Sequence, residues 1–306
     1  MKKICHFRNV LQKNPNMKQS IVFFGGQPLA TATLEELESA GIMPSLVVTS
    51  ADAPKGRGLV LTAPEAKVWA EAHTIPVLQP TTLKNARENN REIAPLFNTE
   101  WDLFIVASYG KILPPEILAL PKHSTLNVHP SLLPKFRGPS PIRSAILEDA
   151  RETGVSIMLM DEELDHGPII AQARVELEES EWPPRATLFE QLLAHAGGEL
   201  LAETIPLWME GTITPEEQDH DKATFSQKIT KEMGMIDLSD DPHKNLLKIR
   251  AYDGWPGTYF MHSRNGKEMR VKIIDAAVAP NGILQILRVI PEGKKEMKYE
   301  DFLRAD

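Results

Sequence analysis

Short apolar runs alternate with stretches of helical spacing along the first two thirds of the chain. Residues 20–26, SIVFFGG, read as a buried strand that ends in glycines, and residues 45–50, SLVVTS, read as a second strand. Between them lies a stretch with helical spacing, for which Thr33 is the expected N-cap and Gly41 the expected C-cap. A strand, a helix and a strand joined by short connections predict a parallel sheet.

The alternation continues to about residue 210, so we expect an α/β domain with a Rossmann-like, mostly parallel sheet. The further elements expected are a short strand at 76–80, a strand and helix within 101–120, a strand at 124–129, a helix at 141–149, a strand at 154–161, a turn leading into another strand, and one or two amphipathic helices within 186–211.

Composition shifts divide the rest of the chain. Residues 1–17 form a polar N-terminal extension, and residues 18–210 form the α/β domain. Residues 211–224 are polar and carry proline, glycine and acidic side chains, which is typical of an interdomain linker. Residues 225–306 are expected to form a second, smaller domain, in which the Asn265-Gly266 pair predicts a β-hairpin.

Charge and cysteine content narrow the classes of function. The 306 residues are 42% hydrophobic and have a net charge of −8, so the chain as a whole is no basic nucleic-acid binder. From Phe225 onward, however, the chain contains 14 Lys and Arg residues and 12 Asp and Glu residues, so this part is slightly basic. Cys5 is the only cysteine, which excludes an intramolecular disulfide and a thiolate metal cluster and fits the cytoplasm. No apolar run reaches the roughly 18 residues of a membrane span, and no cluster suggests a metal site.

Three polar residues stand out in the middle of the chain. Asn127 and His129 are two positions apart on the predicted strand, so their side chains share one face, and Pro130 ends the strand. Together with Asp165, an amide and a charged imidazole can stabilise a developing oxyanion. Each residue alone has a simpler interpretation, because a histidine at a strand end is more often structural and a loop aspartate is more often a turn former.

The surrounding motifs are more specific than the three residues. Asn-x-His-x-Ser-Leu-Leu-Pro begins at Asn127, and Arg137-Gly138, Gly154-Val155-Ser156-Ile157 and Leu164-Asp165-x-Gly167 follow. This pattern resembles the 10-formyltetrahydrofolate-dependent N-formyltransferases, and among them most closely the methionyl-tRNA formyltransferases. The resemblance covers about residues 19–306 and is tightest at 102–170.

The resemblance implies a role for each matching residue. Asn127, His129 and Asp165 would be the catalytic residues, and 10-formyltetrahydrofolate would be the formyl donor. The residues that would contact or line the folate site are Ser131, Leu132, Leu133, Pro134, Tyr109 and Gly110. For Tyr109 the alternative is a half-buried aromatic residue at a strand end.

The resemblance also implies initiator methionyl-tRNA as the partner. Lys55 and Arg57 belong to a Pro-x-Gly-Arg-Gly loop that enters the acceptor end of the tRNA in this family. The family usually has lysine after this motif, where Leu59 and Val60 stand here, so weaker or altered tRNA binding is expected. Lysines that would face phosphates, or else are ordinary solvated surface lysines, are Lys228, Lys231, Lys294 and Lys295.

The second domain would be a small β-barrel that resembles the oligonucleotide-binding fold. Part of the strand sequence that usually precedes the last strand is missing, so we expect an incomplete barrel. Gly167 is expected to adopt a positive φ in the turn that carries Asp165. We further expect a monomer that acts in the cytoplasm, away from membranes.

Other functions stay open at this stage. A sugar-nucleotide N-formyltransferase would share the three catalytic residues but lack the Gly-Arg-Gly loop and the second domain. A glycinamide ribonucleotide formyltransferase would be shorter. A non-catalytic folate- or RNA-binding protein would not need all three residues. Gly25-Gly26 after the first strand is only a fragment of a dinucleotide-binding motif.

Overall fold

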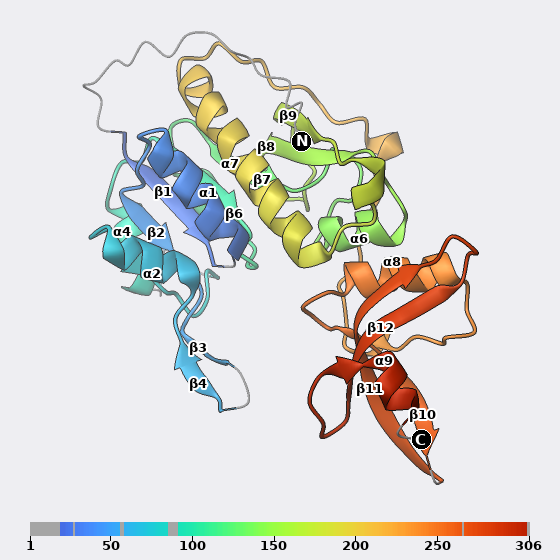
Figure 1. The fold of residues 1–306 in the computed structure, drawn as a ribbon. Coiled ribbons are helices and arrows are strands. Elements are labelled where there is room, and N and C mark those ends of the chain that lie inside the picture. Colours follow the sequence, from blue (N-terminus) through green and yellow to red (C-terminus); the bar gives the residue numbers. More distant parts are fainter. Residues whose placement is uncertain (1–18, 27, 56–57, 85–90, 265, 305–306) are drawn as a thin grey trace.

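A seven-stranded sheet forms the centre of the N-terminal domain (Figure 1). The structure is a computed structural model, and it describes residues 19–304 except 27, 56–57, 85–90 and 265. The strand order is β5-β2-β1-β6-β7-β8-β9. The first five strands in this order are parallel, and β8 and β9 are antiparallel to their neighbours, which confirms a mostly parallel sheet. The bounds are β1 Ile21–Gly25, β2 Leu46–Val48, β5 Val77–Leu78, β6 Leu103–Ala107, β7 Thr125–His129, β8 Thr153–Leu159 and β9 Ile169–Val175.

Side chains of alternate residues on the buried strands enter two separate cores. In β1, Ile21 and Phe23 pack toward helices α1, α2 and α7, whereas Val22 and Phe24 pack toward α4 and α5. The helices of the sheet domain are α1 Pro28–Ser39, α2 Glu65–Ala72, α4 Ala94–Phe97, α5 Pro115–Leu118, α6 Pro141–Leu147 and α7 Ala186–Met209. Short 3-10 turns are η1 Arg91–Ile93, η2 Glu179–Glu181, η3 His220–Lys222 and η4 Glu232–Gly234.

Helix α1 begins earlier than the sequence predicts. It starts at Pro28, directly after the β1 turn, because proline fits the first helical position, where no N–H donor is needed. Thr33 is therefore inside the helix, and the prediction that it is the N-cap is wrong: its buried hydroxyl donates to the Leu29 carbonyl at 2.9 Å. At the other end Gly41 has φ +76°, and the N–H of Ile42 donates to the Leu37 carbonyl at 2.8 Å, as expected of a C-cap.

The C-terminal domain contains an antiparallel sheet of four strands with two helices. Strands β10 and β11 form the predicted hairpin, and Arg264 pairs with Lys267 next to its turn. Within the described part of the chain, no ladder joins β13 back to β10, so the sheet is open, as expected of an incomplete barrel. The elements are β10 Thr258–Arg264, β11 Lys267–Val278, β12 Leu284–Pro291, β13 Met297–Lys298, α8 Pro242–Ala251 and α9 Tyr299–Arg304.

An apolar interface connects the two domains. Phe189 and Leu193 of α7 belong to the same buried cluster as Leu247 and Tyr252 of the C-terminal domain. The side chain of Arg185, just before α7, adds ion pairs to Asp275 at 2.7 Å and to Asp253 at 3.4 Å. Figure 1 shows α8 seated close to α6 and the lower end of α7. The interface thus fixes the small domain relative to the sheet.

Candidate active site

Strand β7 presents Asn127 and His129 on one face of the sheet. Their neighbours Leu126 and Val128 pack into the core beneath α1 and α7, so the two polar side chains point to the opposite face. Asn127 is 8% exposed and His129 is 4% exposed. Strand β7 ends at His129, as the following proline requires, and this places the imidazole at the carboxyl end of the parallel strands.

Asp165 reaches this face from a turn that doubles back over the sheet. Strand β8 is antiparallel to β7, and its last residue, Leu159, pairs with Leu126 near the start of β7. The following residues 160–168 turn back over the sheet, so that Asp165 comes to lie near Asn127 and His129. Asp165 itself has φ +50°. The prediction of a positive φ at Gly167 is wrong, and close packing explains that glycine instead: a Cβ there would lie 2.2 Å from the Leu159 carbonyl oxygen.

The three side chains converge. Asp165 Oδ2 lies 3.7 Å from His129 Nδ1, and Asn127 Nδ2 donates to Asp165 Oδ1 at 3.4 Å. The shortest contact of the carboxylate is with the backbone N–H of Gly138, which donates to Oδ2 at 2.7 Å. The residues that sequence spacing placed together are therefore brought together, although the distances to the two β7 side chains are long for hydrogen bonds.

The second ring nitrogen of His129 determines how the imidazole is used. His129 Nε2 lies 3.0 Å from the carbonyl oxygen of Phe136, which can only accept, so Nε2 carries a proton and donates. Nδ1 is then the nitrogen that faces Asp165, and a proton there would point at a carboxylate. Nδ1 is therefore the ring nitrogen that is left for Asp165 or for a ligand.

The loop after β7 is held from beneath by two side chains. Ser156 Oγ accepts from the Leu133 N–H at 3.1 Å and donates to the Ser131 carbonyl at 2.6 Å. Gln172 Nε2 donates to the Leu133 carbonyl at 3.0 Å. Ser131 and Leu133 are buried, whereas Leu132 and Pro134 are partly exposed. The loop is thus a fixed, mainly apolar segment next to the three polar side chains.

Tyr109 lies just past the end of β6 and is buried, not half-buried as one of the two sequence interpretations expected. It is 6% exposed, and its ring meets Phe24 edge-on with centroids 5.5 Å apart. Its hydroxyl is buried and has no hydrogen-bond partner among the described residues. Gly110, which follows with φ +77°, is exposed. In this structure Tyr109 is thus part of the core on the face of the sheet that carries the polar side chains.

Burial raises the pKa of Tyr109 to about 12, and this predicts a loss of stability at high pH. Between pH 10 and pH 12 the folded protein keeps the phenol proton while the unfolded chain releases it, so the free energy of unfolding falls as pH rises. The loss is about 2–3 kcal/mol by pH 12, at about 1.4 kcal/mol per pKa unit. Tyr109→Phe is expected to flatten this alkaline decline without loss of stability at neutral pH, since it removes an unpaired buried hydroxyl. Urea unfolding of both proteins across this pH range tests the expectation, and equally steep curves would contradict it.

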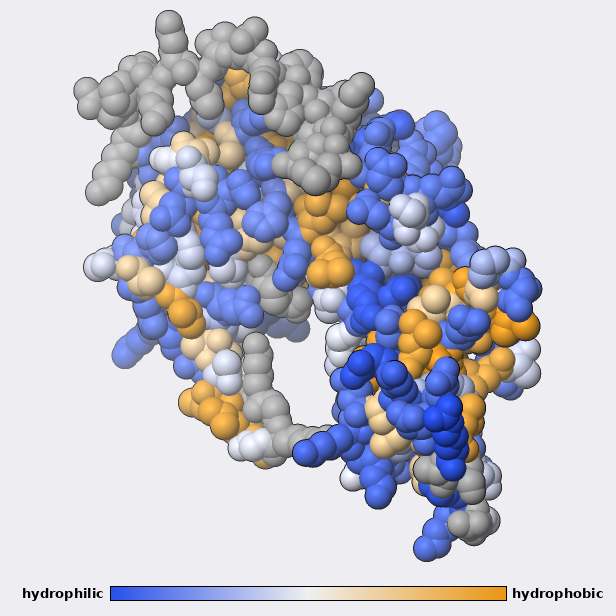
Figure 2. All heavy atoms as spheres, viewed as in Figure 1, coloured by the Kyte–Doolittle hydropathy of each residue, from blue (hydrophilic) through white to orange (hydrophobic). Residues whose placement is uncertain are grey.

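The residues expected to contact tRNA lie on two separate parts of the molecule. Strands β3 Ala53–Lys55 and β4 Val60–Thr62 form a hairpin that projects from the sheet domain (Figure 1). Arg57 and the side chain of Lys55 lie outside the described part of the hairpin. Leu59, Val60 and Leu61 are 72%, 66% and 67% exposed, and the hairpin is accordingly orange in Figure 2. In the C-terminal domain the four lysines expected to face phosphates are all exposed: Lys228, Lys231, Lys294 and Lys295.

A polar cluster anchors the base of this hairpin. Lys67 Nζ bonds to Asp52 Oδ1 and to Gln79 Oε1, both at 2.9 Å, and Gln79 Nε2 also donates to Asp52 Oδ1 at 2.7 Å. The hydrogen bond from Gln79, and next that from Lys67, holds the pKa of the Asp52 carboxyl below its usual range. The hairpin therefore leaves the sheet domain in a defined direction.

Sequence reasoning missed the side chains that support the site from behind. Arg137 and Gln218 are both buried, and Arg137 Nη2 donates to Gln218 Oε1 at 2.7 Å. The Arg137-Gly138 pair within the motif could have drawn attention to Arg137. Nothing in the polar segment around Gln218 distinguishes it from an ordinary linker. Within the described residues, no group of three or more His, Cys, Asp and Glu side chains could hold a metal ion, and no helix is long and apolar enough to cross a membrane.

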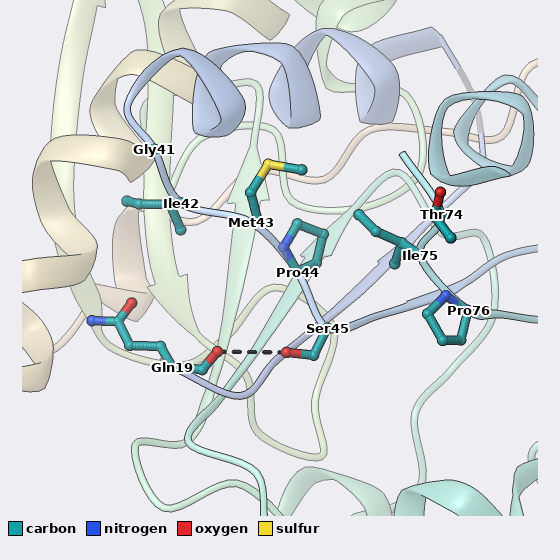
Figure 3. A pocket seen from close by; sticks show the side chains of 9 residues that line it. All are labelled: Gln19, Gly41, Ile42, Met43, Pro44, Ser45, Thr74, Ile75 and Pro76. Carbon is teal, nitrogen blue, oxygen red and sulfur yellow. Dashed lines mark hydrogen bonds between the residues drawn. The ribbon is translucent and has the colours of Figure 1, made fainter. Parts of the chain in front are cut away.

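A cavity of about 380 Å³ lies away from these residues (Figure 3). It is lined by Gln19, by residues 41–45 and by residues 74–76, which precede β1, β2 and β5. This is the amino edge of the sheet, opposite the edge where β7 ends. The lining contains no charged side chain, so the cavity has no ionisable group that could transfer a proton or hold an anion.

Known proteins match both domains of the chain. The formyl transferase family matches residues 18–205, and the formyl transferase C-terminal domain matches residues 228–281. A methionyl-tRNA formyltransferase from Halalkalibacterium halodurans is 37% identical over 93% of this chain and 94% of its own.

Solved structures agree with the fold. A sugar N-formyltransferase from a Shewanella species superposes with a TM-score of 0.60 at 15% identity, over 91% of this chain and all of its own. HypX from Aquifex aeolicus in complex with tetrahydrofolic acid superposes with a TM-score of 0.61 at 18% identity, over 94% of this chain and 47% of its own. At these identities the structures show a shared fold, whereas the sequence match extends to the family. The chain belongs to the methionyl-tRNA formyltransferase family.

Proposed function

We propose that this enzyme transfers a formyl group from 10-formyltetrahydrofolate to the amino group of initiator methionyl-tRNA, with Asn127, His129 and Asp165 as its catalytic residues. The observation that carries the proposal is the convergence of the three side chains at the carboxyl end of β7, beside a stiff apolar loop. The product would serve translation initiation, and the enzyme would act as a monomer in the cytoplasm.

Asn127 and His129 would act on the developing negative charge. As the amine nitrogen bonds to the formyl carbon, the carbonyl electron pair moves to oxygen. Asn127 Nδ2 donates one of its two hydrogens to Asp165 Oδ1 at 3.4 Å, and His129 Nδ1 lies 3.7 Å from Asp165 Oδ2, which is long for a hydrogen bond. The second hydrogen of Asn127 Nδ2 and His129 Nδ1 would donate to the oxyanion, and preorganised donors of this kind each contribute about 10²–10³-fold in rate.

Asp165 would orient the imidazole and accept the proton of the amine. Its carboxylate Oδ2 lies 3.7 Å from His129 Nδ1. The amine must lose one proton as the new C–N bond forms, and Asp165 can accept it directly or through water. The collapse of the oxyanion restores the carbonyl and breaks the bond from the formyl carbon to N10 of the folate, and N10 leaves with the proton that Asp165 took from the amine.

The two domains would share the binding of substrates. The loop with Ser131, Leu132, Leu133 and Pro134 would hold the folate with Tyr109 and Gly110 nearby. The β3–β4 hairpin, with Lys55 and Arg57, would enter the acceptor end of the tRNA. Lys228 and Lys231 of the C-terminal domain are exposed and would contact phosphates. A sugar-nucleotide substrate is less well supported, because the sugar N-formyltransferase shares only 15% of its sequence with this chain.

A formyl-transfer assay with several acceptors tests the proposal. Purified full-length enzyme is incubated with 10-formyltetrahydrofolate and, in separate reactions, with initiator methionyl-tRNA, elongator methionyl-tRNA, a nucleotide-linked amino sugar or glycinamide ribonucleotide. Formylation of initiator methionyl-tRNA is expected, with little or none of the other acceptors. Uncharged initiator tRNA is the control, because it offers no α-amine. Transfer to the amino sugar alone, or to no acceptor, would refute the proposed substrate.

A further inference from the structure

The segment between the two domains lies against the catalytic centre. Glu216 pairs with Ile169 of β9 through two backbone hydrogen bonds of 2.7 and 2.8 Å, and Phe225 forms a parallel bridge with Arg137. We call residues 216–226 the strap. Figure 1 shows the chain leaving the upper end of α7 and passing β9 before it enters the C-terminal domain. The strap thus touches both the turn before β9 and the loop after β7.

Gln218 is the most fully engaged side chain of the strap. It is 4% exposed, and its Nε2 donates to the carbonyls of Asp165 at 3.0 Å and Gly167 at 2.7 Å. Its Oε1 accepts from Arg137 Nε at 3.1 Å and from Arg137 Nη2 at 2.7 Å. Both donor hydrogens and both acceptor sites of the amide are therefore in use.

The contact with Asp165 falls on the backbone of the turn that carries the carboxylate. Asp165 has φ +50°, a left-handed conformation that aspartate adopts more readily than most residues. Two hydrogen bonds from one buried amide fix the carbonyls at Asp165 and Gly167, on either side of His166. The direction in which the carboxylate leaves the chain, and so its distance from His129, depends on this fixed turn.

The strap also supports the other partner of the imidazole. Thr224 Oγ1 accepts from the N–H of Phe136 at 2.8 Å, and the N–H of Ser226 donates to the Arg137 carbonyl at 2.7 Å. Phe136 is the residue whose carbonyl accepts from His129 Nε2, and it too has a positive φ of +59°. Asp165 on one side of the ring and Phe136 on the other are thus both held by the strap.

We infer that the strap is a structural part of the catalytic centre and that Gln218 is a positioning residue, which acts on the reaction by holding Asp165 toward His129. The inference rests on the proposed function, because it works through the catalytic residues named there. The inference adds that catalysis depends on the segment that leads into the C-terminal domain.

Two substitutions of Gln218 in the full-length enzyme separate its contacts. Gln218→Met keeps the length of the side chain and removes all four hydrogen bonds. Gln218→Glu keeps an acceptor for Arg137 but cannot donate to the carbonyls of Asp165 and Gly167. Both variants are expected to lower kcat by about 10- to 100-fold, the effect of a small misplacement of a catalytic group, while KM for both substrates stays within about twofold.

The pH profile of kcat distinguishes positioning from a general structural role. Displacement of Asp165 changes the field at the imidazole, so the profile is expected to shift in both Gln218 variants. Over the pH range in which circular dichroism shows the variants to be fully folded, a merely structural role would leave the profile unshifted. Glu210→Gln is the control, because Glu210 is an exposed carboxylate at the end of α7, outside the strap, and this variant is expected to behave as wild type.

The outcomes keep this inference separate from the proposed function. If His129→Ala is inactive while both Gln218 variants keep the wild-type kcat and pH profile, the strap inference fails and the proposed function stands. If His129→Ala keeps wild-type turnover, the catalytic residues of the proposed function are refuted, and the strap inference, which depends on them, is refuted with them. Circular dichroism checks the fold. Should the Gln218 variants fail to fold, Thr224→Val, which removes the acceptor behind Phe136, is expected to lower kcat, and an unchanged kcat would overturn the inference.

Discussion

Replacement of His129 by alanine is expected to lower kcat for formyl transfer by about 10³-fold, at the upper end of the effect of one oxyanion donor. The substitution removes the Nδ1 donor that faces Asp165 and leaves Asn127 as the remaining side-chain donor of the three. KM for methionyl-tRNA should change little, because the imidazole is buried and offers little surface for binding the body of the tRNA. Single-turnover formylation with both substrates saturating measures the effect.

The matched control for this substitution is His195→Ala. His195 lies on α7 in an exposed ion pair with Glu36, away from β7, so its loss should leave kcat unchanged. His129→Ala also leaves the Phe136 carbonyl without its partner, which costs about 1–3 kcal/mol of stability. Circular dichroism therefore accompanies the kinetics. A well-folded His129→Ala variant with near wild-type turnover would exclude His129 from the chemistry.

Substitution of Asp165 by asparagine is expected to lower kcat by about 10³–10⁴-fold, by analogy with the loss of a carboxylate that orients a catalytic imidazole. The shape of the side chain and the acceptor for the Gly138 N–H are retained, so the turn keeps its geometry. What disappears is the negative charge beside His129 Nδ1, which we propose orients the ring and accepts the proton of the amine. Steady-state kinetics across pH measures the loss.

Glu163→Gln provides the comparison for Asp165→Asn. It removes an exposed carboxylate from the same turn, two residues away, and changes the net charge by the same amount. Its kcat should equal that of the wild type. If both variants lost activity to a similar degree, the effect would come from the charge of the turn as a whole rather than from the carboxylate next to His129.

The sequence predicted the features that depend on local pattern and on motif. The alternating strands, the mostly parallel sheet and the hairpin of β10 and β11 follow from spacing and turn chemistry, and the structure has them, although Asn265 lies outside the described residues. The shared face of Asn127 and His129 follows from the two-residue period of a strand. Membership of the family follows from motifs that the sequence alone displays.

Features that depend on contacts distant in the sequence were predicted less well. Thr33 has the chemistry of an N-cap, but the helix begins at Pro28 because the chain turns directly out of β1. Gly167 was expected to need a positive φ. The structure shows another reason for glycine here: a side chain would collide with the neighbouring Leu159 carbonyl. The hydrogen bonds of Gln218 join residues 218, 165 and 137, and no local pattern signals such a long-range arrangement.

The position of the strap has a consequence for biosynthesis. A nascent chain reaches Gln218 only after all seven strands of the sheet have been translated, since β9 ends at Val175. The sheet and its two cores can form first, while the turn with Asp165 still lacks the amide that fixes it. The growing polypeptide would thus become able to catalyse its reaction late, once the stretch that follows α7 has emerged from the ribosome.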